Sequence, residues 1–220
     1  MKIDILTLFP NMFKGPFDES MILSATKKKL VHIKTHDLRR WGIDKRGSVD
    51  DRTYGGGKGM LIRVDVIAKA LNKVTKRWGL FKKKNLKVVL LDAAGIKFTQ
   101  KKALELSKLD NLVLIAGHYE GIDHRVHEHL VDEIISIGDY VLTGGEIPAM
   151  VLVDSIVRLI PGVLEEEATQ IESHTTEGLL EYPQYTRPVD YKGWKVPKVL
   201  LSGNHKEISD WRKSQEKISR

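Results

Sequence analysis

The sequence predicts an α/β protein in which helices cover both faces of a parallel sheet, followed by a small α-helical domain. Several segments are apolar without alternation, as strands buried on both faces are, and segments of helical periodicity separate them. Three of these strands also run into glycines at their carboxyl ends, where sheets of this kind bind ligands. With 220 residues, of which 41% are hydrophobic, the chain can form one large core and a second small domain.

The expected elements alternate along the first 160 residues. Strands are expected at Lys2–Leu8, Val31–Thr35, Leu86–Gly95, Asn111–Gly121 and Asp132–Leu142, and helices at Glu19–Leu30, Asp65–Thr75, Thr99–Ser107 and Ile147–Ile160. Thr99 is suited to cap the third helix, because its hydroxyl can accept a hydrogen bond from a free backbone N–H. Arg39–Met60 contains too few apolar positions for packed secondary structure. A loop of that length in a compact domain is usually functional or mobile.

The charge of the last sixty residues is uneven. The formal net charge of the chain is +7, but Pro161–Thr186 contains six glutamates and no lysine or arginine, whereas Arg187–Arg220 contains nine basic and four acidic residues. We therefore expect a first domain over residues 1–160, an acidic linker over 161–176 and a small basic domain over 177–220 that ends in a capped helix. The basic tail fits a polyanionic partner and fits a merely solvated surface equally well.

The composition and local patterns of the sequence argue against several kinds of site and segment. The absence of cysteine excludes disulfides and thiolate metal sites, and is typical of a reducing compartment. No run of about 18 apolar residues could span a membrane, and the N-terminus does not read as a signal peptide. Arg52–Met60 has the Gly-Lys pair of a P-loop, but Gly59 stands where a P-loop needs serine or threonine.

Glycines gather at the ends of three predicted strands. They are Gly95, the pair Gly117 and Gly121, and Gly138 with Gly144-Gly145. No dinucleotide-binding fingerprint is present, so these glycines favour close approach of the backbone to a ligand held mainly by main-chain hydrogen bonds. Tight packing of a strand against a helix explains any one of them more simply, but the three together favour a site.

Six motifs then occur in one order. They are "VDDRTYGGGKGM", "GHYEGIDHRV", "SIGDYVLTGGEIPAM", "IPGV", "YPQYTRP" and "VLLSGNH". Together they resemble the bacterial tRNA (guanine-N1)-methyltransferase family, the TrmD type, over nearly the whole chain. The resemblance implies a SPOUT-class methyltransferase domain with a C-terminal trefoil knot, a flexible linker, a small helical domain that binds tRNA, a homodimer and a cytoplasmic enzyme. It also implies methylation of the guanosine immediately 3′ of the anticodon, position 37.

The resemblance assigns the glycine-rich loops to S-adenosylmethionine. Position by position, it implies cofactor binding by Leu90, Leu91, Gly95, Gly117, Tyr119, Glu120, Ile137, Gly138, Asp139, Tyr140, Val141, Leu142, Gly144, Gly145 and Pro148. The residue types fit, because adenine needs an apolar slot with backbone donors and acceptors, and a sulfonium cation is repelled by basic side chains. Asp139 and Glu120 offer compensating negative charge, although Glu120 also fits an ordinary surface carboxylate.

Two residues are the catalytic candidates. The family's base is an aspartate followed by serine, and the matching pair here is Glu172-Ser173, one methylene longer. Glu172 would take the proton from guanine N1, and Arg158 would stabilise the negative charge that develops on the guanine oxygen. The alternatives are an exposed linker glutamate for Glu172 and a helix-capping or ion-pairing role for Arg158.

Further residues are implied as RNA contacts. They are Asp50, Arg52 and Tyr54 before the glycine run, Ser173 and His174 beside the flipped nucleotide, and Lys206, Arg212, Lys213 and Lys217 for phosphates. Trp211 fits either base stacking or the core of the small domain. The family also implies Mg²⁺ dependence, although no ligand cluster in the sequence indicates a tight metal site.

Two departures from the family pattern bear on the cofactor loops. His118 replaces an arginine, and "DAAG" replaces the commoner serine-proline-glutamine-glycine. Both preserve a backbone role. A related knotted methyltransferase acting on another RNA, such as rRNA, and an RNA-binding protein without activity remain the alternative functions.

Overall fold

The computed structural model describes residues 1–75, 85–165, 172–176 and 178–218. It divides into two compact units, Met1–Leu164 and Glu165–Arg220, which are described separately below. No helix of the described part of the chain is both long and apolar enough to cross a bilayer.

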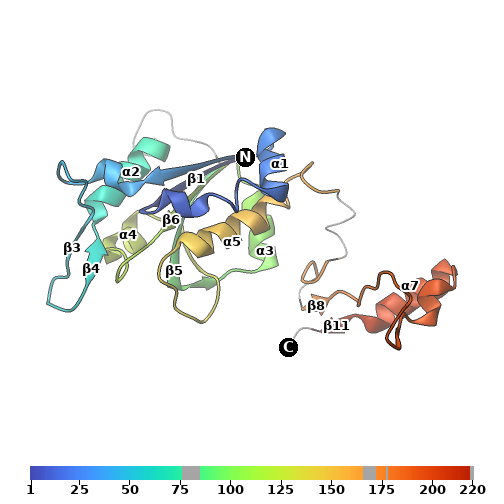
Figure 1. Cartoon of the computed structure of the whole chain (residues 1–220). Helices are drawn as coiled ribbons and strands as arrows, with labels where there is room; N and C mark the ends of the chain where they lie inside the picture. Colours follow the sequence, from blue (N-terminus) through green and yellow to red (C-terminus); the bar gives the residue numbers. More distant parts are fainter. Residues whose placement is uncertain (76–84, 166–171, 177, 219–220) are drawn as a thin grey trace. The chain divides into compact units, whose positions relative to one another are not determined.

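A five-stranded parallel sheet forms the centre of the first unit (Figure 1). Its strands are β1 Lys2–Thr7, β2 His32–Asp37, β5 Leu86–Lys97, β6 Asn111–Ala116 and β7 Glu133–Ser136, in the order β2-β1-β6-β5-β7. Every neighbouring pair in this sheet is parallel. The predicted parallel α/β architecture is therefore confirmed.

Helices cover both faces of this sheet. They are α1 Ser20–Lys27, α2 Val64–Thr75, α3 Gln100–Ser107, α4 His124–His129 and α5 Glu146–Val157. Leu152 of α5 belongs to a core shared with α1 and α3 on one face, and Ile67 of α2 belongs to a second core shared with α4 on the other. Because strand side chains alternate between faces, Leu114 and Ile115 of β6 enter different cores, which explains the apolar run of this strand.

The structure differs from the sequence prediction in four elements of this unit. β6 ends at Ala116, so the predicted continuation of this strand to Gly121 is a loop. β5 continues past Gly95 to Lys97, with an irregularity in its pairing with β7 between Leu91 and Ile96. β7 ends at Ser136, so the rest of the predicted strand is a loop, and Val141 within it is 88% exposed. Helix α4 was not predicted; it begins after Asp123, whose carboxylate accepts a hydrogen bond from the backbone N–H of Arg125.

The polar stretch after β2 is partly ordered, contrary to prediction. It contains a 3-10 helix, Leu38–Trp41, and the antiparallel strands β3 Asp50–Arg52 and β4 Met60–Ile62. A further 3-10 helix, Pro10–Phe13, follows β1. Val49, which precedes β3, and Ile62, the last residue of β4, are both buried. These two apolar side chains help to pack an otherwise polar segment against the core.

A network of ion pairs connects α3 with the amino ends of two strands. Lys87 of β5 and Lys102 of α3 each contact both Glu105 of α3 and Glu133 of β7, with N–O distances between 2.6 and 3.2 Å. Hydrogen bonds from Lys102 and Lys87 lower the pKa of Glu105 to about 2. Thr99 caps α3 as predicted, since its hydroxyl accepts a hydrogen bond from the Lys102 backbone N–H at 3.3 Å.

The second unit is small and has little regular structure. It contains the antiparallel strand pairs β8 Leu179–Leu180 with β11 Lys217–Ile218 and β9 Asp190–Tyr191 with β10 Trp194–Lys195, a 3-10 helix Lys198–Leu201, and α7 His205–Gln215. The predicted capped helix is confirmed, because the Asn204 side chain accepts hydrogen bonds from two backbone N–H groups of the first turn of α7. The two strand pairs were not predicted, since strands of two residues carry no periodicity.

Candidate active site

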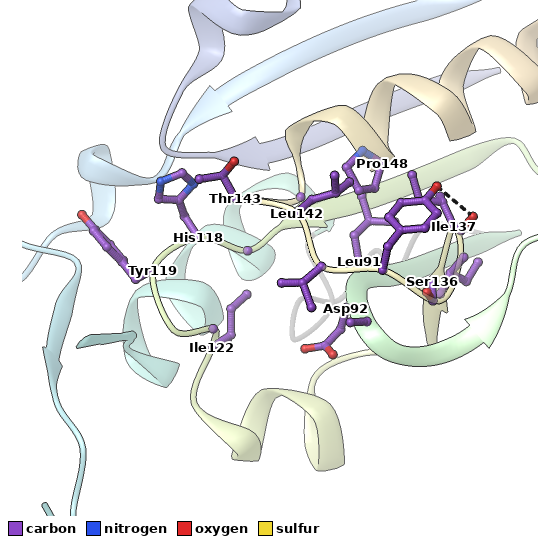
Figure 2. Close-up of a pocket in the computed structure, with 18 of the residues that line it drawn as sticks. Leu91, Asp92, His118, Tyr119, Ile122, Ser136, Ile137, Leu142, Thr143 and Pro148 are labelled. Atoms are coloured by element: carbon purple, nitrogen blue, oxygen red, sulfur yellow. Dashed lines mark hydrogen bonds between the residues drawn. The ribbon is translucent and has the colours of Figure 1, made fainter. Parts of the chain in front are cut away.

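The irregular part of β5 after Leu91 and the loops that follow β6 and β7 enclose a pocket at the carboxyl edge of the sheet (Figure 2). This edge is where α/β sheets bind ligands. Figure 2 shows Leu142 and Pro148 on the side of the pocket next to α5, and Ile122 and Asp92 on the side next to α4. The pocket thus combines apolar side chains with the backbone of three segments.

Gly144 and Gly145 are required by close contacts with neighbouring atoms, not by their backbone dihedral angles. A Cβ atom on Gly145 would lie 2.7 Å from Cα of Ala116, whereas one on Gly144 would lie 2.5 Å from side-chain atoms of Glu146 and His118 and 3.2 Å from the carbonyl oxygen of Gly117. The backbone N–H of Gly145 donates a hydrogen bond of 2.7 Å to that same carbonyl. The segment after β7 therefore returns to the end of β6, and any side chain here would separate the two.

The loop between β7 and α5 supplies the exposed part of the pocket wall. Gly138 adjoins the ring of Tyr140, and a Cβ atom on Gly138 would lie 2.4 Å from that ring. The Tyr140 hydroxyl donates to the carbonyl of Ile137, and the Ser136 hydroxyl donates to the carbonyl of Gly138. These contacts tie the loop to itself, and Tyr140 within it is 55% exposed.

The charged side chains that line the pocket are acidic, apart from His118. They include Asp92 and Glu120, and the lining residues contain no lysine or arginine. Asp92 accepts a hydrogen bond from the backbone N–H of Ala94 at 2.9 Å, and its other carboxylate oxygen lies 3.1 Å from Nε2 of His127. This charge distribution favours a cationic ligand over an anionic one.

A buried carboxylate supports the pocket from behind. Glu146, at the start of α5, is 1% exposed and accepts a hydrogen bond of 2.8 Å from the Thr7 hydroxyl at the end of β1. Nδ1 of His118 lies 3.7 Å from the other Glu146 oxygen and is buried without a hydrogen-bond partner. The ring of Phe9 packs on His118 with a centroid distance of 4.7 Å. These contacts join the ends of β1 and β6 to α5.

Most of the residues that the resemblance assigned to the cofactor come together in this pocket. Those that line it are Leu91, Gly117, Tyr119, Glu120, Ile137, Gly138, Tyr140, Val141, Leu142, Gly144, Gly145 and Pro148. Gly121, which the sequence placed among the glycines of a site, also lines it, and the lining residues that sequence reasoning missed are Asp92, Ala93, His118, Ile122, Ile135, Ser136 and Thr143. All of these except Ile135 stand within the quoted motifs or the DAAG segment, so membership of a motif was the available signal.

Three of the assigned residues lie outside the pocket lining. Leu90 points into the core and is 1% exposed. A Cβ atom on Gly95 would lie 2.6 Å from the backbone of Ile135, so this glycine allows β5 to pair closely with β7. Asp139 turns outward and forms an ion pair of 2.5 Å with Lys97. The sequence of a loop does not reveal which of its side chains point outward.

The glycine-rich hairpin of β3 and β4 contacts the pocket loop. The backbone N–H of Glu120 donates to the carbonyl of Met60, and a Cβ atom on Gly59 would collide with the Glu120 side chain. Tyr54, at the exposed turn of this hairpin, is fully exposed, and Asp50 and Arg52 lie on β3. The hairpin that carries these three candidate RNA contacts therefore adjoins the pocket rim.

The two catalytic candidates lie in different units. Arg158 is the C-cap of α5, whereas the pocket adjoins the first turn of that helix. Twelve residues separate Glu146 from Arg158, about 18 Å along the helix axis. Glu172 belongs to the second unit, where its carbonyl accepts a hydrogen bond from the Thr175 backbone N–H.

The other candidate RNA contacts also lie in the second unit. The Ser173 hydroxyl accepts a hydrogen bond from the Glu181 backbone N–H at 2.9 Å, and the backbone N–H of His174 donates to the carbonyl of Leu179. The side chains of Lys206, Arg212, Lys213 and Lys217 are exposed, and the guanidinium of Arg212 lies over the ring of Tyr182. Trp211 lies against Tyr185 with a centroid distance of 6.4 Å.

The described residues do not form a metal site. Among those that the structure describes, no group of three or more histidine, aspartate or glutamate side chains could hold a metal ion. The described residues therefore do not provide a fitting site for tightly held Mg²⁺.

Comparison with known proteins agrees with the resemblance in the motifs. The model of the family described as tRNA (Guanine-1)-methyltransferase TrmD matches residues 1–220. Relatives named tRNA (guanine-N(1)-)-methyltransferase, from Bacillus cereus (strain AH820), Bacillus anthracis (strain A0248) and Bacillus thuringiensis subsp. konkukian (strain 97-27), are each 51% identical over 212 residues, covering 96% of this chain and 85% of the relative. The chain therefore belongs to the tRNA (guanine-1)-methyltransferase TrmD family.

Proposed function

We propose that this protein transfers a methyl group from S-adenosylmethionine to N1 of the guanosine immediately 3′ of the anticodon, position 37, in tRNA. The observation that carries the proposal is the pocket at the carboxyl edge of the sheet, whose glycine loops, apolar walls and Glu120 carboxylate belong to the motifs that resemble the family. The cytoplasm, which contains the tRNA, is the corresponding compartment.

The pocket fits the cofactor on three grounds. The segment from Ile137 to Leu142 offers apolar side chains beside the backbone of a loop, as an adenine ring requires. Gly117 leaves room for close approach, because the nearest atoms to a Cβ there lie 3.5 Å away. Asp92 and Glu120 provide negative charge for a molecule that carries a sulfonium and an ammonium group. When bound, S-adenosylmethionine supplies a methyl group activated by its positively charged sulfur.

Glu172 is proposed as the general base. N1 of neutral guanine carries a proton, which must leave as the bond to the methyl carbon forms, and a carboxylate within hydrogen-bond reach can accept it. Removal of this proton places negative charge on the guanine oxygen, which the Arg158 guanidinium would stabilise. The turn that follows Glu172 is held by backbone hydrogen bonds, including that from His174 to Leu179, so the carboxylate is attached to an ordered segment.

A second copy of the chain is part of the proposal. Because Arg158 lies at the opposite end of α5 from the pocket, the two are more readily combined when the pocket of one copy faces Arg158 of its partner. An apolar surface suited to such an interface lies on α5, where Ile147 is 50% and Val151 39% exposed four residues apart. Leu104 of α3 is also 48% exposed. A homodimer would bury these side chains.

The family's trefoil knot and domain boundaries are also proposals for this chain. The return of the chain from the end of β7 to the end of β6, which β5 separates in the sheet, supports a knotted path. We propose a methyltransferase domain over residues 1–160, a linker over 161–176 that carries Glu172, and a tRNA-binding domain over 177–220. Mg²⁺ dependence stays a prediction of the family resemblance.

A transfer assay with labelled methyl donor tests the function. We expect incorporation into a tRNA transcript with guanosine at position 37, and none into a transcript that differs only by adenosine there. Equal labelling of the two transcripts would reject the guanine-N1 assignment. Failure of S-adenosylhomocysteine to raise the melting temperature at saturation would reject the cofactor site itself.

A further inference from the structure

The β9–β10 hairpin of the second unit displays two large aromatic side chains to solvent. Tyr191 is 51% and Trp194 75% exposed, although neither side chain is polar enough to favour this. They are directly paired across the two strands, with a centroid distance of 5.7 Å and an angle of 55° between the rings. Cross-strand partners lie on the same face of a hairpin, so together they form one aromatic surface.

The hairpin holds this surface in a defined orientation. Lys192 and Gly193 form its two-residue turn, both with positive φ, at 55° and 89°, as in the tight turns that match the twist of paired strands. The backbone N–H of Gly193 donates to the Asp190 carboxylate at 2.8 Å. Asp190 and Lys195 form the other cross-strand pair, with their charged atoms 3.9 Å apart. The rings are therefore already positioned before a ligand arrives.

Positive charge lies beside the aromatic surface and along the segment that carries it. The ammonium group of Lys192 lies 5.5 Å from the centre of the Tyr191 ring. Residues 187–198 contain Arg187, Lys192, Lys195 and Lys198 against the single Asp190, a balance of four minus one, or +3. Aromatic rings beside cations are what proteins use to bind unpaired nucleotides, because a base stacks on the ring while the cation meets its phosphate. Paired bases offer no free face for such stacking.

We propose that the Tyr191–Trp194 surface is a binding site for an unpaired base of the tRNA substrate. The inference rests on the proposed function. Stacking on a base would act in addition to the phosphate contacts expected along α7. Its role is in substrate affinity, because the rings belong to the second unit and not to the methyl-transfer pocket.

Alanine substitution of one ring in the full-length protein tests the site. We expect Trp194→Ala to weaken binding of a tRNA transcript about 5- to 150-fold, the range that corresponds to loss of one base stack. Trp194→Phe keeps a ring and should restore most of the affinity. Leu201→Ala, which removes a side chain of the same unit that is 53% exposed, is the matched control and should leave tRNA affinity unchanged.

Three further measurements separate stacking from other roles. Trp194→Ala should raise the KM for tRNA, leave kcat and S-adenosylhomocysteine affinity unchanged, and leave the slope of log K against log salt unchanged. Lys192→Ala should reduce that slope by about one ion. A blunt RNA duplex should bind the wild-type protein and Trp194→Ala equally well.

Several results would overturn the proposal. Unchanged tRNA affinity in Trp194→Ala, while the wild-type protein methylates tRNA, would reject this site and leave the proposed function intact. An altered oligomeric state or a lowered melting temperature in Trp194→Ala would show that the rings pack against protein instead. Absence of methyl transfer by the wild-type protein would instead count against the proposed function.

Discussion

Replacement of Gly145 by alanine should separate α5 from the end of β6. The added Cβ atom would lie 2.7 Å from Cα of Ala116 and 2.8 Å from the backbone nitrogen of Gly117. Since ordinary contact begins at 3.4 Å, the backbones must move apart by at least 3.4 minus 2.7, or 0.7 Å. Overpacking of this kind costs about 1–3 kcal/mol. Weakening of the 2.7 Å hydrogen bond from Gly145 to Gly117 adds about 0.5–1.5 kcal/mol.

The expected result is a free energy of unfolding about 2–4 kcal/mol lower than that of the wild type. Thermal unfolding followed by circular dichroism would show a decrease in Tm of roughly 5–15 °C. Calorimetry with S-adenosylhomocysteine should show weaker binding, because the loop that carries Gly144 moves with α5.

Gly117→Ala is the matched comparison for this variant. A Cβ atom at Gly117 would lie no closer than 3.5 Å to its neighbours, so the folded protein accommodates it, while the methyl group still narrows the pocket. We expect weaker S-adenosylhomocysteine binding with little change in Tm. A Gly145→Ala protein with wild-type stability and wild-type ligand affinity would refute the argument that close backbone packing builds the pocket.

Three other predictions concern side chains elsewhere in the protein. Thr7→Val removes the hydroxyl that donates to buried Glu146 and should lower the free energy of unfolding by about 1–3 kcal/mol in urea titrations, while Thr7→Ser should restore it. Glu105→Gln should flatten the dependence of the free energy of unfolding on pH. The pKa of Glu105 in the folded protein, about 2, lies below its usual 4.5, so the stabilisation by this carboxylate is complete above pH 4.5 and is lost as the pH falls toward 2. Because Glu105 is half exposed, this effect should be about 1 kcal/mol or less, and an unchanged pH profile would contradict the ion-pair network. Glu172→Gln should lower kcat about 10²–10⁴-fold with unchanged S-adenosylhomocysteine affinity, and a loss below about tenfold would move the general base to another group.

A mixing experiment tests whether two copies of the chain form one site. Arg158→Ala and a pocket variant such as Gly117→Val should each be inactive alone. If the pocket of one copy works with Arg158 of its partner, co-refolded mixtures should recover about a quarter of wild-type activity, because half of the dimers are mixed and each has one intact site. No recovery in a mixture that demonstrably exchanges subunits would place both residues in one chain.

The sequence alone determined the fold class and the main elements of the first unit. Apolar runs such as that of β6 predict strands buried on both faces because each face must be shielded from water, whatever the order of the strands. Thr99 predicts a helix start because capping is a local interaction between one side chain and its own helix. The glycine motifs located the pocket because they follow strands of a parallel sheet, and such sheets bind ligands beyond the carboxyl ends of their strands.

Only the tertiary structure decided which residues of those motifs reach the pocket. Gly95 and Gly145 are indistinguishable in the sequence, yet one allows β5 to pair with β7 and the other allows α5 to approach β6. Leu90 and Leu91 are adjacent and alike, but the alternation of a strand turns them into the cores on opposite faces of the sheet, and only Leu91 also lines the pocket. The buried pairing of Thr7 with Glu146 joins positions 139 residues apart, which no local pattern reveals. These contacts depend on which segments become neighbours in space, and that is settled when the whole sheet assembles.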